Sequence, residues 1–285
     1  MEWMESISAA IKFIEENLTE EITVEAIAEH VHISPFYFQK GFSMLCGFSV
    51  GDYIRQRRLT LAGSELMATG RKIIDLAVKY GYDSPDSFTK AFARFHGVTP
   101  TAVRRDGAAI RSFAPLKISF SLKGGFIMDY KIVEKEAFTV IGAEKTLPYE
   151  GAMEAVPGFW AEHFATGGGE VVCGQYGVNI DETMEGKEFH YLIADNYDGA
   201  REIPAGYVTR TIPAFTWAVF PCVGAMGQAL QETNQKIFSE WLPNCRDYEF
   251  AAGYCVEYYA DPADFPLGVK DDNYYSEIWI PVKKA

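Results

Sequence analysis

The side chains best suited to binding chemistry lie in two segments of nearly the same sequence, SPFYFQKGF at 34–42 and SPDSFTKAF at 84–92. Each segment places an amide or a hydroxyl beside a lysine, QK at 39–40 and TK at 89–90. Glutamine suits the edge of adenine, lysine suits guanine or a phosphate, and serine and threonine suit several bases. The repeated pattern therefore indicates a duplicated surface that contacts a nucleic acid.

Each segment also has the sequence of a helix with defined ends. A Ser-Pro pair opens it and a glycine, Gly47 or Gly97, follows it, which is the pattern of a capped helix. A shorter segment with helical periodicity precedes each one, VEAIAEHV at 24–31 and KIIDLAVKYGY at 72–82. We therefore expect two helix-turn-helix units, in which the second helix enters the major groove of DNA.

The segment between the two units is predicted to be one long helix. Residues 50–68 would span roughly 28 Å at the helical rise per residue. One turn of B-DNA is about 34 Å long. A rod of this length would place the two reading helices in successive major grooves on one face of the DNA, so a dimer is not needed to position them.

The connecting helix and the second unit carry the most recognisable sequence, RQRRLTLAGSELMAT at 55–69 and IIDLAVKYGYDSPDSFTKAFARFHGVTPTAVRR at 73–105. Residues 6–106 as a whole resemble the AraC-type DNA-binding domain. The resemblance implies that certain positions face bases or phosphates, namely Phe36, Gln39, Lys40, Asp86, Ser87, Thr89 and Lys90. Tyr37 and Arg94 lie on the same outward faces and complete the predicted DNA-binding residues.

Some residues of these helices differ from those common in the family, and others are predicted to pack in the core instead of contacting DNA. An arginine is common where Lys40 and Lys90 stand, and a lysine reads guanine less well because it lacks the bidentate fork. Asp86 repels phosphate, although its carboxylate can accept a hydrogen bond from cytosine N4. The phenylalanines at helical spacing are predicted to form the core of the units: Phe38, Phe42, Phe88, Phe92 and Phe95.

The chain is acidic overall, with a net charge of −13, but the charge is unevenly distributed. Residues 1–112 carry 13 Lys and Arg against 14 Asp and Glu, and residues 113–285 carry 13 against 25. The second part is therefore a poor candidate for phosphate contact. Several arginines of the first part are predicted either to contact phosphates or to pair with the acidic first helix, and the sequence leaves both roles open: Arg55, Arg57, Arg58, Arg104 and Arg105.

The composition argues against several other classes of protein. Five scattered cysteines without a CxxC pair are not typical of a disulfide framework or of a zinc site. No apolar run is long enough to span a bilayer, and the N-terminus lacks the basic start of a signal peptide. We therefore expect a cytoplasmic bacterial protein with no cofactor, no metal and no membrane partner.

The periodicity changes after residue 108. Residues 109–126 are predicted to be a linker or an edge segment that ends at a Gly-Gly pair. Residues 127–285 alternate strand-like segments rich in Val, Ile and aromatic residues with helical segments such as MGQALQETNQKIFSEWLP. The predicted fold has two domains: an all-α double helix-turn-helix domain at 1–108, and an α+β domain with a curved antiparallel sheet and packed helices at 127–285.

The second half is rich in aromatic residues and carboxylates, which together can form a pocket for a cation or a planar ligand. Residues 127–285 resemble the GyrI-like effector-binding domain in YKIVEKEAFTVIGAEKTLPYE, IPAFTWAVFPCVGAM, YCVEYY and SEIWIPVKK. The resemblance implies that Glu257 lies in the ligand pocket and that Glu277 lies near it. The predicted ligand-binding residues are Glu257, Glu277, Tyr149, Trp160, Trp217 and Phe220.

Together these patterns indicate a one-component transcriptional regulator that binds promoter DNA and contacts RNA polymerase. Many members of the resembled family bind lipophilic or cationic drugs, so the expected effector is a small lipophilic or cationic molecule. Two alternatives stay open. Some GyrI-like domains are hydrolases, in which a pocket glutamate would act as general base on an electrophilic small molecule. A module that sequesters a ligand is the other alternative, and we predict no catalytic residues.

Overall fold

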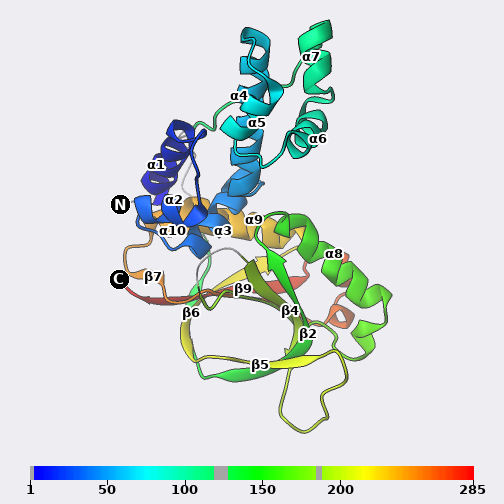
Figure 1. Ribbon diagram of the computed structural model, residues 1–285. Helices are drawn as coiled ribbons and strands as arrows, with labels where there is room; N and C mark the ends of the chain where they lie inside the picture. The colour runs from blue at the N-terminus through cyan, green and yellow to red at the C-terminus, as the bar shows by residue number, and fades with distance from the viewer. Residues whose placement is uncertain (1–2, 119–127, 184–187) are drawn as a thin grey trace.

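The computed structural model describes residues 3–118, 128–183 and 188–285 (Figure 1). The first part is helical, as expected, and both predicted helix-turn-helix units form. The long helix between them also forms and covers the predicted range. The helices are α1 Trp3–Glu16, α2 Val24–His30, α3 Pro35–Cys46, α4 Val50–Ala68, α5 Ile73–Lys79, α6 Pro85–His96 and α7 Pro100–Asp106.

The ends of the two second helices confirm the capping signals. The Ser34 side chain accepts a hydrogen bond from the Tyr37 amide at 3.4 Å, and Ser84 accepts one from Ser87 at 3.2 Å. Gly47 and Gly97 follow the two helices with φ angles of 76° and 79°. A left-handed residue of this kind is where glycine is favoured, because a Cβ atom would clash there.

The second part forms an antiparallel sheet. Its strands are β1 Lys131–Lys135, β2 Phe138–Pro148, β3 Tyr176–Ile180, β4 Glu188–Asn196, β5 Val208–Ile212, β6 Phe215–Val223, β7 Tyr248–Phe250, β8 Tyr254–Tyr259 and β9 Tyr275–Lys284. Within the described residues the strand order is β1-β6-β9-β8-β3-β4-β2-β5, and β7 pairs with β9. The predicted α+β fold is confirmed.

Helices cover one side of this curved sheet (Figure 1). Helix α8, Ala152–Ala165, lies beside β2 and β4, and α9, Gln228–Lys236, lies between the sheet and the first three helices of the chain. A π-helical turn at Ile237–Trp241 and the short α10, Leu242–Asn244, extend α9. Among the residues described, no helix is long and apolar enough to cross a membrane.

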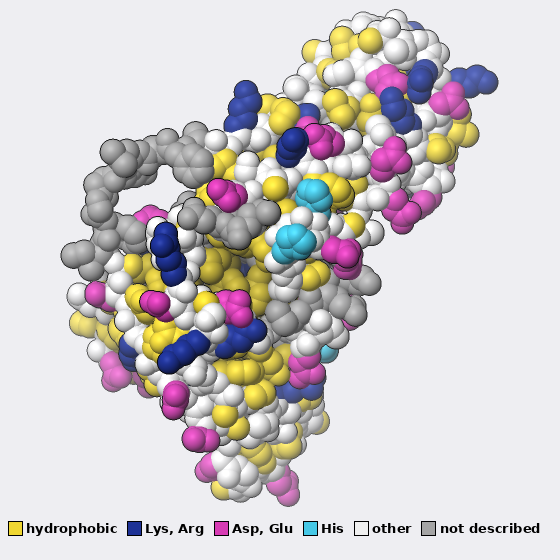
Figure 2. Space-filling view, turned by 90° about the vertical axis from the view of Figure 1, so that its left-hand side faces the viewer, with side chains coloured by type: hydrophobic (Ala, Val, Ile, Leu, Met, Phe, Trp, Pro, Cys, Tyr) yellow, Lys and Arg dark blue, Asp and Glu magenta, His cyan; other side chains and the backbone are white. Residues whose placement is uncertain are grey.

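The two helix-turn-helix units are packed differently. Residues of α1–α4 and residues of the sheet domain share one hydrophobic core, in which Phe38 and Phe42 join Phe220, Phe238 and Ile278. The second unit has a core of its own around Phe88 and Phe92. It lies at the far end of α4 and projects as a narrow lobe from the larger body (Figures 1 and 2). The first unit therefore shares a core with the sheet domain, whereas the core of the second unit contains no residue of the sheet domain among those that the structure describes.

The segment after the last helix of the second unit returns along α4. The Phe113 amide donates to Thr60 Oγ1 at 3.0 Å, and the Leu116 amide donates to the Tyr53 hydroxyl at 3.1 Å. The start of the predicted linker is thus held by α4 as far as Leu116, and residues 119–126 lie outside the described residues. The domain boundaries at 108 and 127 stay predictions.

Candidate effector cavity and DNA-reading helices

The predicted reading face of α6 is accessible. Asp86, Ser87, Lys90 and Arg94 are exposed and Thr89 is half-buried, while Phe88 and Phe92 point into the core. Ser84 caps the helix and Pro85 stands in its first turn, and the helical spacing of residues 86, 90 and 94 places these polar side chains on one outer face. The lobe has both basic and acidic side chains on its surface (Figure 2). The α6 face is thus placed as a DNA-reading helix requires.

The corresponding face of α3 is covered instead. Phe36, Tyr37 and Gln39 are only 0%, 4% and 5% exposed. The ring of Tyr37 stacks on Phe250 of β7, with centroids 3.6 Å apart and planes 6° apart. The hydroxyl of Tyr37 donates to the carbonyl oxygen of Ala252. The outward orientation predicted for these side chains is therefore wrong for this conformation.

The physical reason lies in the residue types. Two large aromatic side chains at the start of a helix gain more from burial than from exposure to water. Phe36 also packs edge-on against Tyr149, with centroids 6.0 Å apart. The sheet domain offers both aromatic partners, so the α3 face is buried on it. Contact between these side chains and DNA stays a prediction, and it requires α3 to leave the sheet domain.

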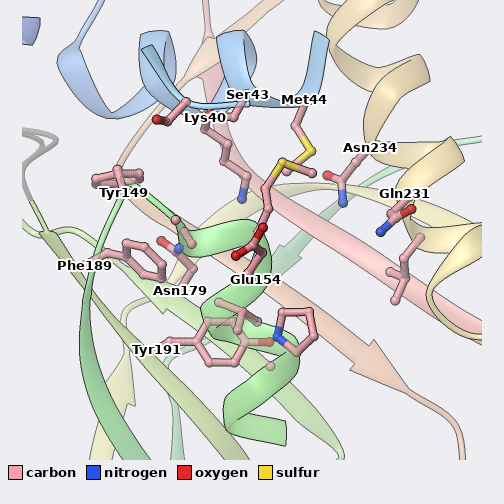
Figure 3. A pocket seen from close by; sticks show the side chains of 18 of the residues that line it. Lys40, Ser43, Met44, Tyr149, Glu154, Asn179, Phe189, Tyr191, Gln231 and Asn234 are labelled. Carbon is pink, nitrogen blue, oxygen red and sulfur yellow. The ribbon is translucent and has the colours of Figure 1, made fainter. Parts of the chain in front are cut away.

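A cavity of about 750 Å³ lies between α3 and the sheet domain. Helices α8 and α9 and strands β3, β4 and β8 form its other walls (Figure 3). Its size fits a drug-sized ligand, since ligand cavities are typically about 300–1,000 Å³. The cavity is therefore the candidate effector site.

Glu257 lies in this cavity because of the alternation along β8. Cys255, Glu257 and Tyr259 occupy every second position of the strand, so they share one face, and all three line the cavity. One carboxylate oxygen of Glu257, Oε2, accepts hydrogen bonds from the hydroxyls of Tyr191 at 3.0 Å and Tyr259 at 2.8 Å. The indole of Trp160 donates in turn to the Tyr191 hydroxyl at 3.0 Å.

This network leaves Glu257 with hydrogen-bonding capacity for a ligand. Burial raises the pKa of both Tyr191 and Tyr259, and the nearby charge of Glu257 raises it further, so the two phenols stay protonated and donate. No residue in the described part of the chain donates to the other oxygen of Glu257, Oε1. A cation that enters the cavity can pair with this oxygen without breaking a tyrosine hydrogen bond.

Further polar groups line the same cavity. The side-chain oxygens of Asn179 and Asn234 are buried without a hydrogen-bond partner in the described structure. Lys40 of α3 points into the cavity from the opposite wall, among side chains that include Asn179 and Glu154 (Figure 3). These groups add hydrogen-bonding positions to a cavity whose lining also includes the charged residues Asp52, Arg55 and Glu150, while most of the remaining lining residues are aromatic, aliphatic or glycine.

The predicted ligand-binding residues divide into two groups. Glu257, Tyr149 and Trp160 line the cavity. Trp217 and Phe220 do not, because Trp217 packs against Trp279 in a core on the other face of the sheet and Phe220 is buried in the core shared with α1–α4. Their aromatic character reflects packing, which corrects the prediction for both positions.

Glu277 is also misplaced by the prediction. The residue directly opposite Glu257 across the β8–β9 pair is Ile278, so Glu277 points to the other face. There it accepts hydrogen bonds from Tyr275 at 2.7 Å, Trp279 at 2.6 Å and Lys131 at 3.2 Å. Burial alone would raise its pKa, but these hydrogen bonds and the Lys131 charge outweigh burial and lower the pKa. It is a buried, fully partnered structural carboxylate.

Sequence reasoning missed several cavity residues. Tyr191 and Tyr259, the donors to Glu257, were not among the predicted ligand-binding residues, although the alternation of YCVEYY places Tyr259 on the Glu257 face. Asn179 and Cys255 were also missed. Lys40 was assigned to DNA, and only the three-dimensional packing of α3 reveals that it lines the cavity.

The open roles of the arginines are largely decided by their partners. Arg57 forms an ion pair with Glu15 of the first helix at 2.9 Å, and its side chain is 7% exposed. Arg58 donates to the carbonyl of Leu18 at 2.8 Å, and Arg55 pairs with Asp52 and with Glu150 of the sheet domain. These three arginines are structural. Arg104 donates to the carbonyl of Arg71, while Arg105 pairs with Asp106 and is exposed.

The lone histidines and carboxylates form no metal centre in the residues described. His163 is buried and bonds the carbonyl of Val172 at 2.9 Å, and His190 lies 2.7 Å from Glu144. Both histidines therefore have partners within the fold.

Comparison with known proteins matches both halves of the chain. The family described as integron-associated effector binding protein matches residues 131–282, and the family described as helix-turn-helix domain matches residues 27–106. The HTH-type transcriptional activator AarP of Providencia stuartii is 38% identical over 98 residues, which cover 34% of this chain and 73% of AarP. The protein belongs to the AraC-type transcriptional regulators with a GyrI-like effector-binding domain.

Two further relatives show how this AraC-type regulator compares along its length. The regulatory protein SoxS of Salmonella typhimurium is 35% identical over 104 residues, which cover 36% of the chain and 97% of SoxS. The right origin-binding protein of Escherichia coli K12 is 26% identical over 286 aligned positions, which cover 95% of the chain and 96% of that protein. The latter match extends over both the DNA-binding and the effector-binding parts.

Proposed function

We propose that this regulator senses a small lipophilic cation in the cavity between α3 and the sheet domain and controls a promoter in response. One observation carries the proposal: Glu257 is positioned by two tyrosines at the wall of an aromatic cavity, and its second oxygen has no donor in the described residues. A carboxylate in such a site gains from a ligand that brings a positive charge, since no side chain of the described residues forms an ion pair with Glu257. Aromatic walls add cation–π attraction.

Two ions of opposite charge test whether the cavity selects a cation. Tetraphenylphosphonium and tetraphenylborate have the same shape and nearly the same size but opposite charge. We expect the cation to quench the fluorescence of Trp160, which lines the cavity, and the borate to bind much more weakly. Equal binding of the two ions would remove the role of Glu257 as the charge that selects the ligand.

The carboxylate is tested directly by Glu257→Gln, with Glu277→Gln as the matched control on the opposite face of the sheet. Glutamine keeps an acceptor for the two tyrosine hydroxyls but removes the charge, so affinity for the phosphonium ion should fall on the order of tenfold or more. Glu277→Gln should leave that affinity unchanged. A Glu257→Gln protein that binds the cation like wild type would overturn the proposed site.

On the DNA side, we propose that α6 reads promoter DNA through Ser87, Thr89, Lys90 and Arg94, and the exposure of Ser87, Lys90 and Arg94 supports the assignment. The names of AarP and SoxS describe a transcriptional activator and a regulatory protein. These names favour regulation over the alternative of a hydrolase, and contact with RNA polymerase is part of the proposal. A regulator of promoters acts in the cytoplasm, the location expected from the sequence.

A further inference from the structure

The first reading helix and the effector cavity share the same side chains. Helix α3 packs Phe36 and Tyr37 on the sheet domain and buries Gln39 beside them, and its next residue, Lys40, lines the cavity that contains Glu257. A helix cannot lie in a major groove and on the sheet domain at the same time, because the same face makes both contacts. The state of the cavity and the availability of α3 for DNA are therefore linked.

The position of Lys40 indicates the direction of this link. Its ammonium group lies near the Cys255 thiol, where its charge and hydrogen bonding oppose the rise in pKa that burial causes in that thiol. Glu257 is two residues further along the same strand face, about 7 Å from Cys255. Within the described residues no carboxylate lies at ion-pairing distance from Lys40. Lys40 thus places a positive charge at the site proposed for a positive ligand.

We propose that Lys40 acts as a tethered cation in the effector cavity, and that a cationic ligand bound at Glu257 displaces it and releases α3 for DNA. This inference rests on the proposed function, because it takes the ligand to be a cation. The docked state is then autoinhibited: α3 is held by the Tyr37–Phe250 stack and the Tyr37–Ala252 hydrogen bond, and the following helix α4 is tied to the sheet domain by the Arg55–Glu150 ion pair. By thermodynamic linkage, the contacts that keep α3 on the sheet domain also weaken the binding of the cation.

The first test measures the competition without DNA. Lys40→Met removes the charge and keeps the length of the side chain, while Lys40→Arg keeps the charge. Two like charges in the same partly buried cavity repel strongly enough that Lys40→Met should bind tetraphenylphosphonium on the order of tenfold more tightly. Lys40→Arg should bind it like wild type. Unchanged affinity in Lys40→Met would overturn the tethered-cation role.

The second test measures the release of α3 itself. Gln39→Cys places a thiol on the buried face, at a side chain whose amide nitrogen has no partner in the described structure, so the change removes no hydrogen bond from that nitrogen. The repeat supplies the control, Thr89→Cys, because Thr89 occupies the equivalent position of α6 and is half-buried there. Maleimide labelling of each introduced thiol is followed by peptide mass spectrometry in the full-length protein, which separates it from the native cysteines.

We expect the Gln39→Cys thiol to be labelled roughly tenfold or more slowly than the Thr89→Cys thiol in the free protein, because labelling on α3 requires local opening. Tetraphenylphosphonium should accelerate labelling at position 39 alone, and tetraphenylborate should not. Tryptophan quenching by the cation without any change at position 39, or with slower labelling there, would overturn the release mechanism and leave the proposed effector site standing. Absence of cation binding to wild type and to Lys40→Met would overturn the proposed function, and with it this coupling.

Discussion

Gly177 of β3 lies directly opposite Glu257 of β8, and the space that its missing side chain leaves is occupied by the hydroxyl of Tyr191. A Cβ atom at Gly177 would lie 2.4 Å from that hydroxyl and 2.9 Å from Glu257 Oε2. The hydrogen bond between Tyr191 and Glu257 therefore depends on a glycine at this position of the sheet.

Replacement of Gly177 by alanine should disrupt this network. The new methyl group must push the tyrosine or the glutamate away, and both are held in a packed site, so we expect a loss of about 1–3 kcal/mol in the free energy of unfolding. Affinity for tetraphenylphosphonium should fall as well. Gly158→Ala is the control, because nothing lies within 4 Å of its would-be Cβ and it is in a helix. Urea denaturation of both variants measures the difference, and equal stability would contradict the steric argument.

The two glutamates should behave in opposite ways when replaced by glutamine. Glu277→Gln weakens a buried set of hydrogen bonds from Tyr275, Trp279 and Lys131, so it should cost about 1–3 kcal/mol of stability without affecting the ligand. Glu257→Gln should affect the ligand with little loss of stability, because glutamine still accepts from the tyrosines. Urea denaturation and phosphonium titration of both variants distinguish the two roles. A destabilised Glu257→Gln protein beside an unchanged Glu277→Gln protein would reverse the assignment.

Glu277 should also make stability depend on pH. Its pKa in the folded protein is lowered from the ordinary value of 4.5, so the unfolded chain binds its proton more readily than the folded one does. The stabilisation is therefore fully present above pH 4.5 and is lost as the pH falls through the lower pKa of the folded state. The stability difference between wild type and Glu277→Gln should narrow below pH 4.5. If the difference in unfolding free energy between wild type and Glu277→Gln stays constant well below pH 4.5, the charge of Glu277 contributes nothing to stability.

The helical elements of the DNA-binding part could be predicted because their signals are local. Ser34-Pro35 and Gly47 act within one turn of the helix ends that they define, and no distant contact changes this. The faces of Glu257 and Glu277 could not be predicted in the same way. They depend on the register between β8 and β9, and a slip of one residue would exchange the two faces.

The docking of α3 on the sheet domain could not be predicted from the sequence either, because it joins residues such as Tyr37 and Ala252, which are 215 positions apart. The apolar character of Phe36 and Tyr37 was the available signal. A helix face that reads DNA is usually polar, and two neighbouring aromatic residues on it are better suited to a protein partner. The second unit has Asp86 and Ser87 at the equivalent positions, and its face is exposed.

The exposed face of α6 predicts how DNA binding responds to salt. Lys90→Ala should weaken binding to a fragment from upstream of the protein's own gene and reduce the slope of log affinity against log salt by about 1, if Lys90 contacts a phosphate. Arg57→Ala is unsuitable as a neutral comparison, because it breaks a buried ion pair with Glu15 and should cost about 3–5 kcal/mol of stability. Fluorescence anisotropy at several salt concentrations measures the slope, and an unchanged slope would remove Lys90 from the phosphate contacts.

The docking surface of α3 can be altered from the side of the sheet domain without any change to α3 itself. Phe250→Ala removes the ring that stacks on Tyr37 and leaves every side chain of α3 intact. Such a stacked pair is worth about 0.5–1.5 kcal/mol beyond its buried area. Loss of the ring should therefore raise the affinity for DNA several-fold in the absence of any ligand, because more molecules have α3 released.

Phe265→Ala is the matched control for this experiment, since Phe265 packs on Tyr274 and makes no ring contact with α3 within the described part of the chain. It should leave DNA affinity unchanged, and both variants should keep a cooperative thermal transition. Suppose that Phe250→Ala binds DNA no better than Phe265→Ala, while the Gln39→Cys thiol is labelled faster in the Phe250→Ala background. In that case α3 does not limit DNA binding, and α6 alone determines it.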